Sequence, residues 1–184
     1  MDHADGVRLA RGQWKNNGQQ RPPFAIDPRG GQESVWDYPR PPAIVEDNRE
    51  VIVRFDEIIV ARTTRSLRIC ETASPPTFYL PPTDVDQNFL RRSKSSTFCE
   101  WKGQATYWSL EISEQEVHVD VGWSYEQPLA EFEPIKGFFA FYPGRLNCTV
   151  DGNTVLSQPG DFYGGWITPE IVGPFKGESG TLGW

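Results

Sequence analysis

Three residues near the middle of the chain, Glu71, Cys99 and Lys102, are of types that can do chemistry together. A lysine beside a cysteine lowers the pKa of the thiol, and a carboxylate can orient the lysine ammonium. The same part of the sequence is rich in aromatic residues, namely Tyr79, Trp101, Tyr107, Trp123 and Tyr125. We therefore predict that these eight residues form a ligand-binding site, in which charges orient the ligand and rings provide contact area.

The same residues allow two other interpretations. Cys99 or Lys102 could act as a nucleophile, which would make the protein an enzyme. Alternatively, Cys99 is a small core residue, Lys102 is a solvated residue in a turn before Gly103, and the aromatic residues are the hydrophobic core. A buried thiol would favour binding over catalysis, whereas a solvent-accessible thiol with a basic neighbour would favour an enzyme.

A histidine and an aspartate, His118 and Asp120, have the types of a base and its orienting acid for Cys99. Alternation over residues 117–121 places three valines on one strand face and this pair on the other. Residues two apart on a strand lie about 7 Å apart, too far for a direct hydrogen bond. We therefore predict that both side chains are on the solvated face of a strand. The other histidine, His3, is too remote to complete a metal site with the cysteines.

The elements that position these residues are predicted to be strands. Glycine and proline together account for 33 of the 184 residues, which argues against long helices. Alternating or β-branched runs predict strands, several of them in hairpins, at residues 51–55, 58–61, 67–71, 77–80, 107–111, 117–122, 146–150 and 154–156. The fold class predicted is all-β: a compact antiparallel sheet or barrel-like domain with one short helix and extended N- and C-terminal segments.

Two proline pairs flank the strand predicted at residues 77–80. We expect at least one cis bond in Ser74-Pro75-Pro76 or Leu80-Pro81-Pro82, because the strand must enter and leave the sheet abruptly. The short helix is predicted at residues 83–90, with Thr83 as its N-cap.

Three segments are predicted along the chain. Residues 1–33 form a polar N-terminal arm, with Trp14 and Phe24 as its large apolar anchors. Residues 34–156 form the β-rich domain, and residues 157–184 form a tail rich in glycine and aromatic residues that packs on it. We expect the arm to lie on the domain or on a second copy of the chain, which would make a homodimer through the arm.

Charge and cysteine content exclude several classes of protein. The formal net charge of −7 argues against a surface that binds nucleic acid or anionic lipid. The three cysteines form no CxxC pair, so neither a disulfide framework nor a zinc site is predicted. The N-terminus lacks an apolar signal segment, and no run approaches the roughly 18 apolar residues of a membrane span. We expect a cytoplasmic protein without cofactor, metal, nucleic-acid partner or membrane partner.

Several short motifs resemble a known family. They are Cys70-Glu71-Thr72, Pro75-Pro76-Thr77-Phe78-Tyr79 and Cys99-Glu100-Trp101-Lys102-Gly103, with Trp36, Trp123-Ser124-Tyr125 and Phe141-Tyr142 around them. From about residue 34 to residue 142 the chain resembles domain of unknown function 427, which is also labelled NTP_transf_9. The tail, with Gly164-Gly165-Trp166-Ile167-Thr168, is similar to that of cyanobacterial members.

The resemblance implies an antiparallel β domain with no agreed activity. Many members have a histidine before the first proline pair, where this chain has Ser74. The label suggests nucleotidyl transfer, but the chain has neither a Gly-rich phosphate loop nor a spaced aspartate pair for two magnesium ions. Our prediction is therefore binding of a small or peptide-like ligand in an aromatic-lined pocket. The alternatives are a cytosolic enzyme using Cys99 or Lys102, and a protein-interaction module built on the aromatic arm and tail.

Overall fold

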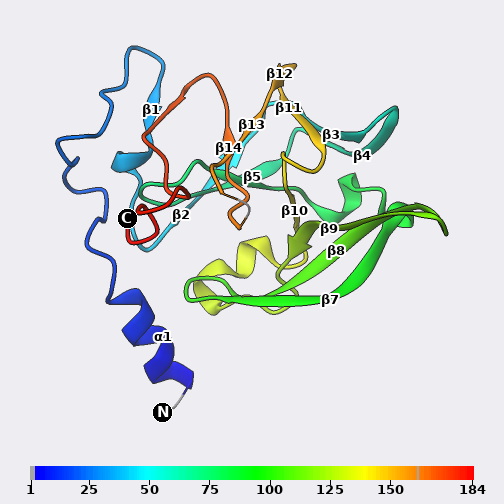
Figure 1. The fold of residues 1–184 in the computed structure, drawn as a ribbon, viewed down its shortest axis with the longest axis horizontal. Coiled ribbons are helices and arrows are strands. Elements are labelled where there is room, and N and C mark those ends of the chain that lie inside the picture. The colour runs from blue at the N-terminus through cyan, green and yellow to red at the C-terminus, as the bar shows by residue number, and fades with distance from the viewer. Residues whose placement is uncertain (1–2, 161) are drawn as a thin grey trace.

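Short strands form most of the regular structure in the computed structural model, which describes residues 3–160 and 162–184 (Figure 1). The strands are β1 (Glu33–Ser34), β2 (Ala43–Asp47), β3 (Val51–Phe55), β4 (Ile58–Thr63), β5 (Ser66–Cys70), β6 (Thr77–Tyr79), β7 (Leu90–Cys99), β8 (Gly103–Ser113), β9 (Glu116–Ser124), β10 (Phe139–Phe141), β11 (Asn147–Val150), β12 (Asn153–Thr154), β13 (Leu156–Ser157), β14 (Trp166–Ile167) and β15 (Ile171–Val172). The helices are α1 (His3–Arg11) and the 3-10 turns η1 (Val35–Asp37), η2 (Pro82–Asp84), η3 (Gln87–Phe89) and η4 (Ala130–Ile135).

Two four-stranded antiparallel sheets enclose the main core. One has the order β10-β9-β8-β7 and the other β12-β11-β3-β4, and they occupy the lower and upper right of Figure 1. Val51, Val53 and Val150 of the second sheet pack against Leu110 and Phe141 of the first, all essentially inaccessible to solvent. Alternation along each strand turns these apolar side chains toward the opposite sheet, so their burial stabilises the pairing of the two sheets.

A third sheet, β2-β5-β6, and the two terminal segments cover the side of the molecule where the candidate site lies. Its residues Ile69 and Tyr79 belong to a second core cluster, together with Trp101, Trp123 and Tyr125. The tail lies beside the end of the arm, where β15 and β1 form a parallel pair. Both termini therefore contribute to the structure around this second core.

The all-β fold class is confirmed, and the antiparallel hairpins β3–β4, β8–β9 and β11–β12 form where alternation predicted them. The described strands do not close into a barrel. Among the described residues, none of the helices has the length and apolar character of a membrane span.

The helix predicted at residues 83–90 is wrong. This stretch forms the 3-10 turns η2 and η3, and then starts β7 at Leu90. The α-helix of the described chain is instead α1, in the arm. Its last turn carries Arg8 and Arg11, which complement the helix dipole, and Arg11 fixes it to the domain by pairing with Glu131 at 3.0 Å.

The predicted cis bonds in the two proline pairs are also wrong, since the cis peptide bonds of the described chain are Arg40–Pro41 and Gly173–Pro174.

The predicted face assignment around His118 is wrong as well. Val117 and Val119 are exposed, while the His118 ring packs on Phe55 with a centroid distance of 4.2 Å. Asp120 adopts a left-handed backbone conformation with φ of 53°, and the register of β9 against β8 shifts next to it. A bulge of this kind reverses the side-chain alternation. His118, before the bulge, and Val121, after it, therefore both face inward.

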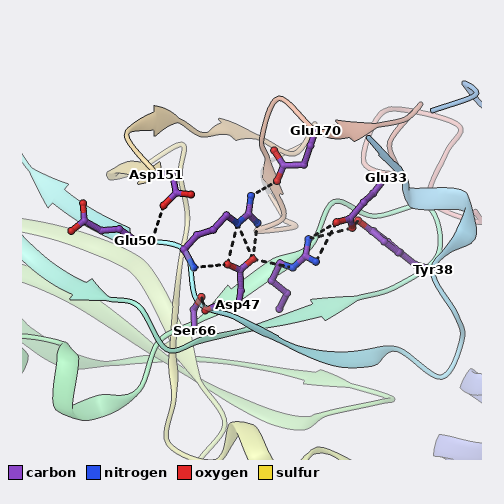
Figure 2. Close-up of polar contacts among 9 residues, drawn as sticks. Glu33, Tyr38, Asp47, Glu50, Ser66, Asp151 and Glu170 are labelled. Carbon is purple, nitrogen blue, oxygen red and sulfur yellow. Dashed lines mark hydrogen bonds and ion pairs between the residues drawn. The ribbon is translucent and has the colours of Figure 1, made fainter. Parts of the chain in front are cut away.

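A network of charged side chains joins the tail and the arm to the domain (Figure 2). Asp47, at the end of β2, pairs with Arg49 at 2.6 Å and with Arg68 at 3.2 Å. Arg49 also pairs with Glu170 of the tail, and Arg68 pairs with Glu33 of β1 at 3.3 Å. Burial alone would raise the pKa of Asp47, but the hydrogen bonds from the side chain and backbone of Arg49 and the charges of Arg49 and Arg68 lower it. Asp47 therefore links segments that are distant in sequence.

Candidate functional site

A cavity of about 160 Å³ lies between the first sheet, the β5–β6 turn and the terminal segments. The sheet and turn residues that line it include Glu71, Ser74, Pro75, Thr77, Tyr79, Thr97, Glu100, Lys102, Ala105, Tyr107, Trp123, Tyr125 and Tyr142. The arm contributes Trp14, and the tail contributes Gln158, Phe162, Tyr163, Gly164 and Lys176. Segments from the whole length of the chain therefore meet at this cavity.

Six of the eight residues predicted for the site line the cavity: Glu71, Tyr79, Lys102, Tyr107, Trp123 and Tyr125. The other two do not. Cys99 is partly buried beside Lys102. Trp101 is buried, and the guanidinium carbon of Arg11 lies 4.9 Å from the centroid of its ring. The sequence pattern thus identified residues that share one cavity, and their binding of a ligand stays a prediction.

Lys102 is held by the turn between β7 and β8. The turn is closed by the pairing of Cys99 with Gly103, which adopts a positive φ of 97° that favours glycine. The carbonyl of Lys102 accepts a hydrogen bond from the backbone N–H of Leu129 at 3.0 Å. Burial lowers the pKa of the Lys102 ammonium, but the neighbouring Cys99, Tyr79 and Glu71 outweigh burial and raise it. Lys102 is therefore charged at neutral pH.

Glu71 is paired with a residue that sequence reasoning missed, Arg40. The guanidinium Nε of Arg40 lies 3.0 Å from Glu71 Oε1, and the Arg40 side chain is 3% exposed. Arg40 also donates to the carbonyls of Asn16, Thr72 and Trp184. It therefore neutralises Glu71 and ties the arm and the C-terminus to the end of β5. Its position in a proline-rich segment offered no sequence signal for this role.

The aromatic wall is held by hydrogen bonds between its own members. The indole N–H of Trp123 donates to the Tyr79 hydroxyl at 3.2 Å, and Thr97 and Tyr107 share a hydrogen bond of 3.0 Å. Burial raises the pKa of Tyr79 to about 12 and also raises that of Tyr125. These phenols remain protonated at neutral pH and can donate hydrogen bonds within the cavity.

The tail contributes a second lysine, Lys176, which the sequence reasoning missed. Its side chain is buried, and its Nζ lies 3.7 Å from the ring centroid of Trp14 and 5.1 Å from that of Tyr163. Its backbone N–H donates to Ala73 O at 2.8 Å, and its carbonyl accepts from the Gln158 side chain at 2.8 Å.

A sequence signal for Lys176 did exist. Trp101-Lys102-Gly103 and Phe175-Lys176-Gly177 are both an aromatic residue, a lysine and a glycine, and both glycines have positive φ. Burial lowers the pKa of Lys176 to about 8, with the charge of Arg40 acting in the same direction and Glu71, Glu100 and Cys99 opposing it.

Cys70 and Cys148 are poorly placed for nucleophilic chemistry, and Cys99 lies far from the histidine proposed as its base. Burial raises the pKa of Cys70 to about 11 and raises that of Cys148 further. Cys99 pairs with Gly103 and His118 with Leu110, so the backbone positions of the two residues are seven strand positions, or about 23 Å, apart along the sheet. Among the described residues no group of three or more His, Cys, Asp and Glu side chains could hold a metal ion.

The aromatic residues of the arm and tail mostly pack on one another. Phe24 of the arm stacks on Trp184 at 5.0 Å and packs edge-on against Trp36 at 5.1 Å. Trp36 and Trp166 are fully buried. These rings fasten the two terminal segments to the domain, while Phe24 and Phe162 remain 50% and 62% exposed.

Comparison with known proteins identifies the family. The profile of the family described as NTP_transf_9, domain of unknown function (DUF427), matches residues 43–152. No curated protein matches the chain. The matched segment includes Glu71, Tyr79 and Lys102, whereas Trp14 and Lys176 lie outside it. Because the match covers more than half of the sequence, the chain belongs to this family, the domain of unknown function DUF427.

Proposed function

We propose that the protein binds a small anionic molecule in the cavity, with Lys102 holding the anionic group. The observation that carries this proposal is that two lysines line an aromatic cavity and that, among the described residues, neither forms an ion pair with a carboxylate, although Glu71 and Glu100 also line the cavity. Among the described residues, neither Lys102 nor Lys176 has a carboxylate oxygen within 4.0 Å, because Glu71 is paired with Arg40 and Glu100 accepts the Trp14 indole N–H. An anion would supply the missing partner for Lys102.

The volume supports a small ligand. Pockets for drug-sized molecules have about 300–1,000 Å³, whereas a cavity of about 150 Å³ holds a molecule of the size of benzene. At about 160 Å³, the cavity fits a ligand of a few carbon atoms with one charged group. This size favours a small carboxylate over a nucleoside triphosphate or a peptide.

The surrounding groups support recognition of a carboxylate with a short carbon chain. Lys102 offers three donors, and the Tyr107 hydroxyl lies on the same cavity wall. The rings of Trp123 and Tyr142, with centroids 4.6 Å apart, present an apolar surface for the remainder of the ligand. A charged anchor combined with aromatic contact area is the usual arrangement of a small-molecule site.

The experiment measures thermal unfolding in the presence of formate, acetate, glyoxylate, pyruvate and inorganic phosphate, with acetamide as the neutral comparison. A ligand present at 100 times its Kd stabilises the folded state by about 2.7 kcal/mol. We expect at least one small carboxylate to raise Tm, and Lys102→Met to abolish this increase while keeping the apolar stem of the side chain.

The matched control is Lys136→Met. Lys136 is exposed and pairs with Glu133 at 3.1 Å, outside the cavity. This variant should respond to the anion as the unmodified protein does. The proposal fails if none of the anions raises Tm, or if Lys102→Met and Lys136→Met respond equally.

A further inference from the structure

We propose that Lys176 is a nucleophile that forms a Schiff base with a small carbonyl compound in the cavity. The class of compound follows from the proposed function: a 2-oxo acid would place its carboxylate on Lys102 and its carbonyl carbon at Lys176. The inference rests on that function only for the carboxylate, since the reaction at Lys176 requires the carbonyl group alone.

The two cavity lysines differ in a way that separates their roles. Both residues line the cavity, and Cys99 and Glu71 raise the pKa of each. The pKa of Lys102 is raised, so it remains a cation that can hold an anion. The pKa of Lys176 is lowered to about 8 by burial, so a useful share of its amine is neutral. Neighbouring groups whose pKa values are driven apart are a common basis for distinct chemical roles.

The position of Lys176 is well defined by its backbone and its neighbours. The hydrogen bonds to Ala73 and Gln158 fix its main chain on both sides. A side chain at the following position would meet Pro159 O at 1.8 Å, so only glycine fits at Gly177. Ala73 itself has a positive φ of 71°, a strained conformation of the kind found near functional sites. The structure thus fixes the backbone of this lysine beside the cavity.

The charged groups around Lys176 come from several parts of the chain. Arg40 lowers its pKa, whereas Glu71, Glu100 and Cys99 raise it. The Trp14 and Tyr163 rings contact the amine from the arm and the tail. At pH 7 about one Lys176 amine in ten is neutral, against on the order of one in a thousand for a lysine of ordinary pKa.

Imine formation between the Lys176 amine and a carbonyl compound needs no further reagent. The lone pair of the neutral Lys176 amine attacks the carbonyl carbon, and the C=O electron pair moves to oxygen to form a carbinolamine. Loss of water, which carries away the carbonyl oxygen and the two amine protons, leaves the C=N bond.

The test traps the imine by reduction. The full-length protein is incubated with glyoxylate and cyanoborohydride, which reduces an imine to a stable secondary amine, and the modified lysines are identified by mass spectrometry. The chain has five lysines, and Lys15, Lys94 and Lys136 are exposed internal controls. We expect modification of Lys176 to exceed that of each exposed lysine by at least about tenfold at pH 7. It should rise with pH around a midpoint near 8.

Two variants separate this inference from the proposed function. Lys176→Arg keeps a positive charge beside Trp14 but has no neutral amine, so reductive modification at position 176 should disappear. Lys102→Met should reduce the modification of Lys176 by glyoxylate but leave that by acetaldehyde, which has no carboxylate. Undiminished glyoxylate modification in Lys102→Met would support the Schiff base and contradict the anion anchor. Equal modification of all lysines, or a glyoxylate-dependent increase in Tm without modification of Lys176, would overturn the Schiff base.

Discussion

Replacing Asp47 by asparagine should destabilise the protein substantially, because it removes one charge from between two guanidinium groups. The Asp47 side chain is 6% exposed, and those of Arg49 and Arg68 are 29% and 11% exposed. Removing one partner of a buried ion pair costs about 3–5 kcal/mol. Because Arg49 is partly exposed, we expect the free energy of unfolding to fall by about 3 kcal/mol, near the lower end of this range. For a chain of this length that loss corresponds to a decrease in Tm of about 6–12 °C.

The assay is urea unfolding followed by tryptophan fluorescence, with Glu50→Gln as the matched control. Glu50 pairs with Arg62 at 2.6 Å, but both side chains are exposed, so this change should cost at most about 1 kcal/mol. An asparagine at position 47 can still accept the backbone N–H of Arg49, which keeps the turn after β2 intact. Equal stability of the two variants at pH 7 would refute the role assigned to Asp47.

The pH dependence gives a second test of the same reasoning. The pKa of Asp47 is lowered in the folded state, so its contribution is complete above the unfolded value of about 3.9 and disappears as pH falls through the folded value. Glu170, which pairs with Arg49, also has a lowered pKa. The difference in unfolding free energy between Asp47→Asn and the unmodified protein should therefore be constant between pH 5 and 7 and shrink in more acidic solution. If the difference were independent of pH, the stabilisation by Asp47 would not be electrostatic.

Two further predictions concern the cavity and the arm. In Gly164→Ala the added Cβ would lie 2.2 Å from the ring of Trp123, which lines the cavity. The clash should displace this wall, and the carboxylate-induced rise in Tm should be lost. The control is Gly30→Ala, where nothing lies within 4 Å. Deletion of residues 1–30 should leave a β-rich circular dichroism spectrum but lower the unfolding free energy by about 2–4 kcal/mol, since Phe24 leaves the rings of Trp36 and Trp184. An unchanged Tm would show that the arm does not stabilise the domain.

The strands were predictable wherever their side chains alternate between apolar and polar. In β3, Val51 and Val53 face the core, and this period of two is visible in the sequence without any knowledge of the partner strand. Strand β7 was missed because it lies at the edge of its sheet and most of its side chains are exposed, so it has no apolar face to reveal it. The face of His118 was misassigned because the bulge at Asp120 depends on how β9 pairs with β8.

In the candidate site, too, some residues could be predicted from the sequence and others required the fold. Trp101-Lys102-Gly103 and the aromatic residues that follow it drew attention to one wall of the cavity, because unusual residue types occur there close together in sequence. The opposite wall required the fold. Lys176 reaches the cavity through hydrogen bonds to Ala73 and Gln158, Trp14 reaches it through Glu100, and Arg40 binds Glu71 from a proline-rich segment. Local sequence determined the strands whose side chains alternate, such as β3. Tertiary packing decided the edge strand β7, the bulge in β9 and which distant segments meet, because these depend on the burial of apolar faces that no single segment contains.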